Sequence, residues 1–147
     1  MSAKRHKPAP TGCFCNALRQ ASRAVSRLYD EELRGVGLRT TQYSLLHHLA
    51  RAGQVRQGDL VGLTHLEETT LTRNLRPLAA AGWVSVCCGN DRRERIVAIT
   101  EAGAAKLAEA LPAWERAQTR MQALLPKGTW QGLLTILPEV ARLTAGA

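Results

Sequence analysis

At 147 residues, of which 45% are hydrophobic, the chain is long enough to bury one core and too short for two independent domains. Alanine and leucine dominate and only 4% of the residues are aromatic, which is typical of a helical protein and argues against a β-sandwich. The net charge of +8 favours a polyanionic partner, although a membrane surface or a merely soluble basic protein also fits this charge.

The sequence shows no signal for export or for membrane insertion. No apolar run approaches the roughly 20 residues that cross a bilayer, and residues 1–10 lack the apolar segment of a secretory signal. We therefore expect a cytoplasmic protein with no membrane partner. Cysteines in that compartment are thiols by default, so any disulfide among Cys13, Cys15, Cys87 and Cys88 would be a switch.

Residues 1–12 are predicted to form a flexible basic tail, because they combine Lys4, Arg5 and Lys7 with two prolines. A solvated tail without function and an arm that contacts phosphates both fit this composition. The single domain is predicted to span residues 13–147.

A long first helix is predicted from about Cys13 to Arg34, with Gly35 and Gly37 at its end. Its apolar residues recur at helical spacing and comprise Leu18, Ala21, Val25, Leu28 and Leu33. The opposite face carries Arg19, Arg23 and Arg27, as a solvent-facing stripe does.

The next segment has the pattern of a helix-turn-helix. A helix capped by Thr40 or Thr41 is followed by two short helical segments, residues 57–63 and 67–81. Only a few residues separate these two segments, which is helix-turn-helix spacing.

A small β-hairpin, or wing, is predicted next. Residues 83–87 alternate apolar and polar side chains, residues 89–91 are turn formers, and residues 96–99 are mostly β-branched. Thr100 is placed to cap the helix that follows. Three arginines crowd the turn, and an arginine-tipped ribbon suits a groove of nucleic acid; they are Arg92, Arg93 and Arg95.

Two more helices complete the chain. One is predicted from Thr100 to Leu125 with a kink at Pro112, and the other over residues 130–143 after a break at residues 126–128.

The predicted fold class is mainly α with a small β-wing. A winged helix-turn-helix of about residues 40–100 is flanked by dimerisation helices at about 14–34 and 101–147. The first and last helices are too apolar for one small winged domain to cover, so we expect a homodimer. Packing within a single chain is the alternative.

The second helix of the helix-turn-helix has the composition of a DNA-reading helix. Leu71, Leu75 and Leu78 form its buried stripe, which leaves polar side chains outward or on the flanks: Thr69, Thr70, Thr72, Arg73, Asn74 and Arg76. Arginine pairs with guanine, asparagine with adenine, and a threonine methyl contacts a thymine methyl. The expected partner is double-stranded DNA, with a solvated polar face as the alternative for any one residue.

Several motifs resemble those of the MarR family over roughly residues 14–144. They are Leu71-Thr72-Arg73-Asn74-Leu75, Ala81-Gly82-Trp83-Val84, Asp91-Arg92-Arg93 and Ile99-Thr100-Glu101-Ala102-Gly103. The resemblance implies a homodimeric winged helix-turn-helix repressor with its recognition helix in the major groove and a wing arginine in the minor groove. By this match Arg93 enters the minor groove with electrostatic support from Asp91, while Arg92 and Arg95 meet phosphates.

The first helix resembles the organic-hydroperoxide-sensing branch of that family, read from Cys15 through Tyr29 to Thr41-Gln42-Tyr43. The resemblance implies that oxidation of Cys15 releases DNA. A helix N-terminus lowers a thiol's pKa, and thiolate is the form that a peroxide attacks. Tyr29 matches a tyrosine that holds the cysteine, but it lies about 21 Å along a continuous helix and would reach Cys15 only across a dimer. Thr40 replaces the second expected tyrosine, and Cys13 is the nearest thiol that could form a bridge.

A small aromatic or phenolic inducer is the other signal that the resemblance implies. Its pocket would lie between the dimer helices and the winged domain, near Arg19, Arg23, Tyr43 and His47. Neither cysteine pair has the spacing of zinc ligands, so we expect no metal and no cofactor. Alternation along the wing strand predicts one of Cys87 and Cys88 toward the core and the other exposed.

Two other classes of function compete with a regulator. An architectural protein would bind nucleic acid without sequence preference. A thiol-dependent enzyme is disfavoured, because the sequence has no phosphate-binding glycine loop, serine-histidine-acid signature or metal motif. We therefore expect no enzymatic activity.

Overall fold

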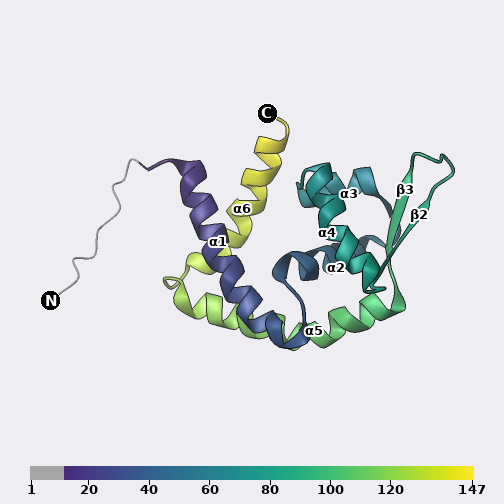
Figure 1. The fold of residues 1–147 in the computed structure, drawn as a ribbon. Coiled ribbons are helices and arrows are strands. Elements are labelled where there is room, and N and C mark those ends of the chain that lie inside the picture. The colour runs from purple at the N-terminus through teal and green to yellow at the C-terminus, as the bar shows by residue number, and fades with distance from the viewer. Residues whose placement is uncertain (1–11) are drawn as a thin grey trace.

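The structure is a computed structural model that describes residues 12–147. The predicted basic tail, apart from Gly12, lies outside the described residues. The described part contains six α-helices, one short 3-10 helix and three strands (Figure 1). In chain order they are α1 (Phe14–Leu33), η1 (Arg34–Val36), α2 (Thr40–Ala52), β1 (Val55–Arg56), α3 (Gln57–Thr64), α4 (Glu68–Ala80), β2 (Val84–Cys88), β3 (Arg95–Ile99), α5 (Glu101–Leu124) and α6 (Thr129–Ala145).

The predicted fold class is confirmed, and the sheet has one strand more than expected. Strand order is β1-β3-β2 with both pairings antiparallel, so β3 is central and pairs through Val97 with Val55 and Val86. The additional strand, β1, is only two residues long and has no periodic pattern of its own. These two residues form a strand because they pair with β3.

The core lies where α2, α3 and α4 meet the base of the sheet. Leu46, Leu49, Leu60, Leu71 and Leu78 are completely buried there, and so is Val97 of the central strand. The leucine spacing that predicted the helices is therefore also the packing pattern of the core.

Helix α5 follows the wing in the chain and runs along the base of the molecule, where it packs against α1 (Figure 1). The Tyr29 hydroxyl of α1 donates a hydrogen bond to the Gln118 side-chain oxygen of α5. The Asp30 carboxylate accepts from the amide of Thr40 at 2.7 Å, and the residue that caps α2 is Arg39 rather than a threonine. The predicted cap was wrong by one or two residues because Asp30, distant in sequence, binds the first helical amide.

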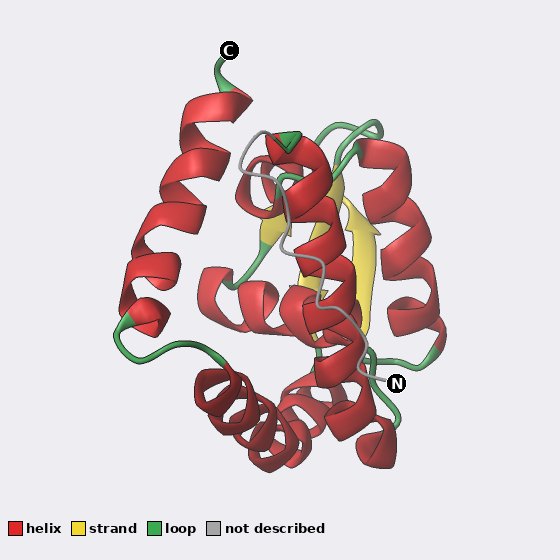
Figure 2. Ribbon diagram, turned by 90° about the vertical axis from the view of Figure 1, so that its left-hand side faces the viewer, coloured by secondary structure: helices red, strands yellow, loops and turns green. Residues whose placement is uncertain are grey.

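Helix α6 stands apart from the other helices in the view of Figure 2. The predicted break separates it from α5, which ends at Leu124 and is continuous through Pro112. None of its residues is buried. Among the described residues, no helix is long and apolar enough to cross a membrane.

Candidate nucleic-acid interface

The wing is joined to α5 through a tight junction at Thr100. Its hydroxyl donates to the Gly82 carbonyl (2.6 Å) and accepts from the Gly103 amide (3.0 Å), so Thr100 caps α5 as predicted and also holds the end of α4. A Cβ at Gly103 would lie 2.0 Å from the carbonyl oxygen of Trp83. Only glycine fits, and this close approach fixes the wing relative to the helical body.

Helix α4 presents an outward face, which we call the recognition face. Leu71, Leu75 and Leu78 are buried as predicted. At about 100° per residue, the opposite side of the helix carries the three residues of the recognition face, all exposed: Thr69, Arg73 and Arg76. These side chains are free to enter a groove.

Two of the six predicted α4 residues lie on the flank beside α2. Asn74 is half-buried and lines a hollow together with Ser44 and His48. Thr70, one turn earlier on the same flank, is also half-buried. Sequence periodicity could not distinguish residues on this flank from residues on the outward face, because the distinction depends on how α2 packs against α4.

Thr72 lies on the other flank, where its hydroxyl is engaged within the protein. Its oxygen lies 2.9 Å from the Glu68 carbonyl, which can only accept, so the single hydroxyl proton is used there. The Gln57 amide nitrogen, also at 2.9 Å, therefore donates to Thr72. Thr72 has no proton to donate to DNA, and the group it offers is its methyl. Sequence reasoning missed Gln57, because its role depends on how α3 approaches α4.

The recognition face and the wing border one hollow of about 410 Å³. Thr72 and Arg76 line it from α4, and Val86 and Arg95 line it from the wing. Two predicted DNA-contacting segments, separate in sequence, are therefore adjacent in the fold.

Asp91 shapes the wing tip through backbone hydrogen bonds. Its Oδ1 accepts from the amide of Arg93 (3.1 Å), and its carbonyl accepts from the amide of Glu94 (2.9 Å). Asp91 therefore supports the turn through hydrogen bonds, and the electrostatic support of Arg93 stays a prediction. Arg93 is exposed and so are Arg92 and Arg95, and within residues 12–147 none of these three arginines forms an ion pair.

The chain is similar in sequence and in fold to known proteins. The profile of the MarR family matches residues 36–94. YwoH of Bacillus subtilis strain 168, an uncharacterised HTH-type transcriptional regulator, is 30% identical over 92 residues, which are 63% of this chain and 67% of YwoH. The crystal structure of the M. tuberculosis transcriptional regulator MosR in complex with DNA is also 30% identical, with a TM-score of 0.82 over 92% of this chain and 98% of MosR. The chain belongs to the MarR family.

A cysteine-to-serine mutant of E. coli MarR complexed with operator DNA has the same fold, with a TM-score of 0.75 at 22% identity over 86% of this chain and 91% of that chain. As a MarR-family member the protein is a DNA-binding transcriptional regulator and not an enzyme. The predicted family and the predicted absence of enzymatic activity are both confirmed.

The thiols of this MarR-family chain are all exposed. Cys13 is the N-cap residue of α1 and Cys15 is its second residue. Because α1 is continuous from Phe14 to Leu33, Tyr29 is about 21 Å away from Cys15 along the helix. Tyr29 instead contacts α5 of its own chain, where burial raises its pKa.

The expectation that one of the two wing cysteines is buried was wrong. Cys87 and Cys88 are both exposed, because β2 is an edge strand that leaves the protein body after Val84. Alternation places their side chains on opposite faces of the strand, but neither face is covered there.

The four predicted ligand-pocket residues are divided between a ring stack on α2 and exposed positions on α1. Tyr43 is buried, and its ring stacks on Trp114 and His47 with centroids 5.8 and 6.1 Å away. Burial, with the nearby charge of Glu115, raises the pKa of Tyr43. Arg19 and Arg23 are exposed on α1.

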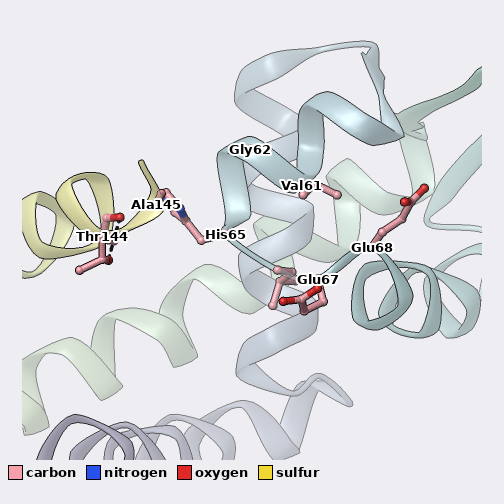
Figure 3. Close-up of a pocket in the computed structure, with 9 residues that line it drawn as sticks. Val61, Gly62, His65, Glu67, Glu68, Thr144 and Ala145 are labelled. Atoms are coloured by element: carbon pink, nitrogen blue, oxygen red, sulfur yellow. Dashed lines mark hydrogen bonds between the residues drawn. The ribbon is translucent and has the colours of Figure 1, made fainter. Parts of the chain in front are cut away.

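A hollow of about 650 Å³ lies elsewhere, between the helix-turn-helix and the end of α6 (Figure 3). Thr144 and Ala145 of α6 face the turn at His65, and Glu67 and Glu68 make the far wall acidic. That charge repels an anionic aromatic ligand. The hollow contains none of the predicted pocket residues and does not replace the predicted site.

Proposed function

We propose that the protein is a repressor that binds a pseudo-palindromic operator as a homodimer. Oxidation of a thiol, or binding of a small aromatic or phenolic ligand, releases it from the operator. The observation that carries the proposal is the hollow that Arg76 of the recognition face and Arg95 of the wing both line. One element fits a major groove, and the arginine-tipped ribbon beside it reaches the next minor groove. A cytoplasmic location accords with this function.

The arginines have three roles in the proposed complex. Arg73 and Arg76 face base edges, together with Thr69 and the Thr72 methyl. Thr70 and Asn74, on the flank, meet the edge of the same groove. Arg93 enters the minor groove, while Arg92 and Arg95 contact phosphates.

The exposed apolar residues of α6 support the homodimer. Leu134, Ile136, Leu137 and Leu143 are 43–60% exposed in the single chain, and Phe14 at the start of α1 is 65% exposed. Such a surface requires a partner, and a two-fold partner presents two recognition helices to two half-sites.

Two observations bear on the signal. Cys13 and Cys15 are exposed at the start of α1, where an oxidant has access. Arg19 and Arg23 are exposed on α1 while Tyr43 is buried, so we infer that the second subunit completes the alternative ligand site.

The decisive experiment is a DNA-binding titration on the region upstream of the protein's own gene. Organic hydroperoxide, diamide and phenolic ligands are added to the native protein and to Cys15→Ser, with Cys87→Ser as a matched exposed-thiol control. If Cys15 is the switch, oxidant releases native protein and Cys87→Ser but leaves Cys15→Ser bound. Release of all three proteins alike would assign the switch elsewhere.

The wing assignment has its own test. Arg93→Ala should weaken operator binding by about 1–3 kcal/mol at physiological salt, because it removes a groove contact. Unchanged affinity would contradict the assignment. Equal binding to operator and random DNA by the native protein would favour the architectural function instead.

A further inference from the structure

Glu94 is held at three points near the tip of the wing. Its amide donates to the Asp91 carbonyl and its own carbonyl accepts from the Gly89 amide, both at 2.9 Å. Its carboxylate Oε1 lies 3.5 Å from Nη1 of Arg56 in β1. Glu94 therefore closes the hairpin and also connects its tip to the strand that leads into α3.

Gly89 shows how closely the Glu94 side chain lies against the hairpin. A Cβ at residue 89 would lie 2.7 Å from Oε2 of Glu94 and 2.9 Å from its Cβ. The missing side chain leaves room for the carboxylate, whose other oxygen faces Arg56. The glycine thus permits the geometry of the ion pair.

We propose that Glu94 is a positioning residue that fixes the wing tip relative to the helix-turn-helix through Arg56. Arg56 directly precedes α3, and Arg56, Arg93 and Glu94 border one hollow of about 290 Å³. A tip that is already held loses less conformational freedom when Arg93 enters a groove, so the pair strengthens binding without touching DNA. This inference rests on the proposed DNA-binding role of the wing.

Because Glu94 is charged, the inference can be tested by whether its neutralisation weakens or strengthens DNA binding. A carboxylate near DNA repels phosphates, so electrostatics alone predicts that Glu94→Gln binds DNA more tightly. A positioning role predicts the opposite, a loss of about threefold, which is the size expected for a partly exposed ion pair.

The experiment compares operator affinity at fixed salt for the native protein, Glu94→Gln and Glu67→Gln. Glu67 is the matched control, an exposed acid at the start of α4 without an ion pair in residues 12–147. We expect about threefold weaker binding for Glu94→Gln, and equal or tighter binding for Glu67→Gln. Glu94→Asp keeps the charge but withdraws it from Arg56, so it should also weaken binding.

A double-mutant cycle distinguishes positioning from a general structural effect. Glu94→Gln should have a smaller effect in an Arg93→Ala background, because the main residue that it positions is gone. The reversed pair, Arg56→Glu with Glu94→Arg, should return operator affinity to within about twofold of the native value. Thermal unfolding of every variant identifies any loss of folding, in which case Glu94→Asp carries the test.

Three results would overturn the inference. They are tighter or equal binding by both Glu94 variants, a loss that persists undiminished in the Arg93→Ala background, and no recovery by the reversed pair. If Arg93→Ala weakens binding while the Glu94 variants do not, this inference alone fails. If native protein does not distinguish operator from random DNA, the proposed function fails and this inference fails with it.

Discussion

The winged helix-turn-helix, which we call the winged body, buries its apolar residues, whereas helix α6 leaves its own exposed. Leu46, Leu49 and Leu60 of the winged body are completely buried, whereas no residue of α6 is buried and Leu137 is 43% exposed. The winged body completes its core within one chain. Helix α6 has an apolar surface that one chain leaves open, so the DNA-reading part and the proposed dimer-forming part depend on different contacts.

The largest expected effect comes from a cavity in the body. Leu46→Ala should lower the free energy of unfolding by about 2–5 kcal/mol, because this completely buried side chain leaves a cavity that its neighbours fill only in part. Chemical unfolding measures the change. A loss below about 1 kcal/mol would show that the body does not depend on this core.

A charge on α6 should separate the subunits while the body stays folded. Leu137→Glu should convert dimer to monomer in sedimentation equilibrium and weaken operator binding about 100-fold, because two linked half-site contacts become one. Thr135→Glu is the control, since Thr135 lies on the polar side of the same helix. A dimer that survives Leu137→Glu would place the interface elsewhere.

Substitutions in the winged body should change DNA binding without changing the dimer, and they should distinguish base contacts from phosphate contacts. Arg73→Ala should cost about 1–3 kcal/mol on operator and relax base preference, whereas Arg92→Ala should weaken all sequences alike and lower the salt slope by about one. Titrations at several salt concentrations measure both. Identical behaviour of the two variants would contradict the division between base and phosphate contacts.

The helices were predictable because their signals are local. Leucine periodicity gave α1 to α6 within a few residues, and Thr100 and the break before α6 followed from residue type alone. Two features were not predicted correctly, and the reason is the same for both, because each depends on contact with another segment of the chain. Strand β1 exists only against β3, and the Arg39 cap of α2 depends on Asp30 of α1.

The residues of the candidate site could be named from the sequence, but the contacts between them could not. The polar set of α4 and the wing arginines were named from the sequence, yet their division into outward and flanking residues depends on helix packing. The Gln57–Thr72 hydrogen bond and the Arg56–Glu94 ion pair join segments that no spacing rule links. The exposure of both Cys87 and Cys88 follows from an edge position that strand alternation does not reveal.

The smallest expected effect concerns two tyrosines, one at the contact between α1 and α5 and the other in the core of the winged helix-turn-helix. Tyr29 joins α1 to α5 and Tyr43 lies in the core, and burial raises both pKa values above the ordinary 10.0. The folded state thus favours the protonated rings, and the stability from this preference is complete below pH 10 and declines as pH rises through the folded pKa values. Ultraviolet titration of tyrosinate should therefore show two late steps, one lost in Tyr29→Phe and the other in Tyr43→Phe. A native step at pH 10 that disappears only in Tyr29→Phe would mean that the α1–α5 junction is open while the body remains packed.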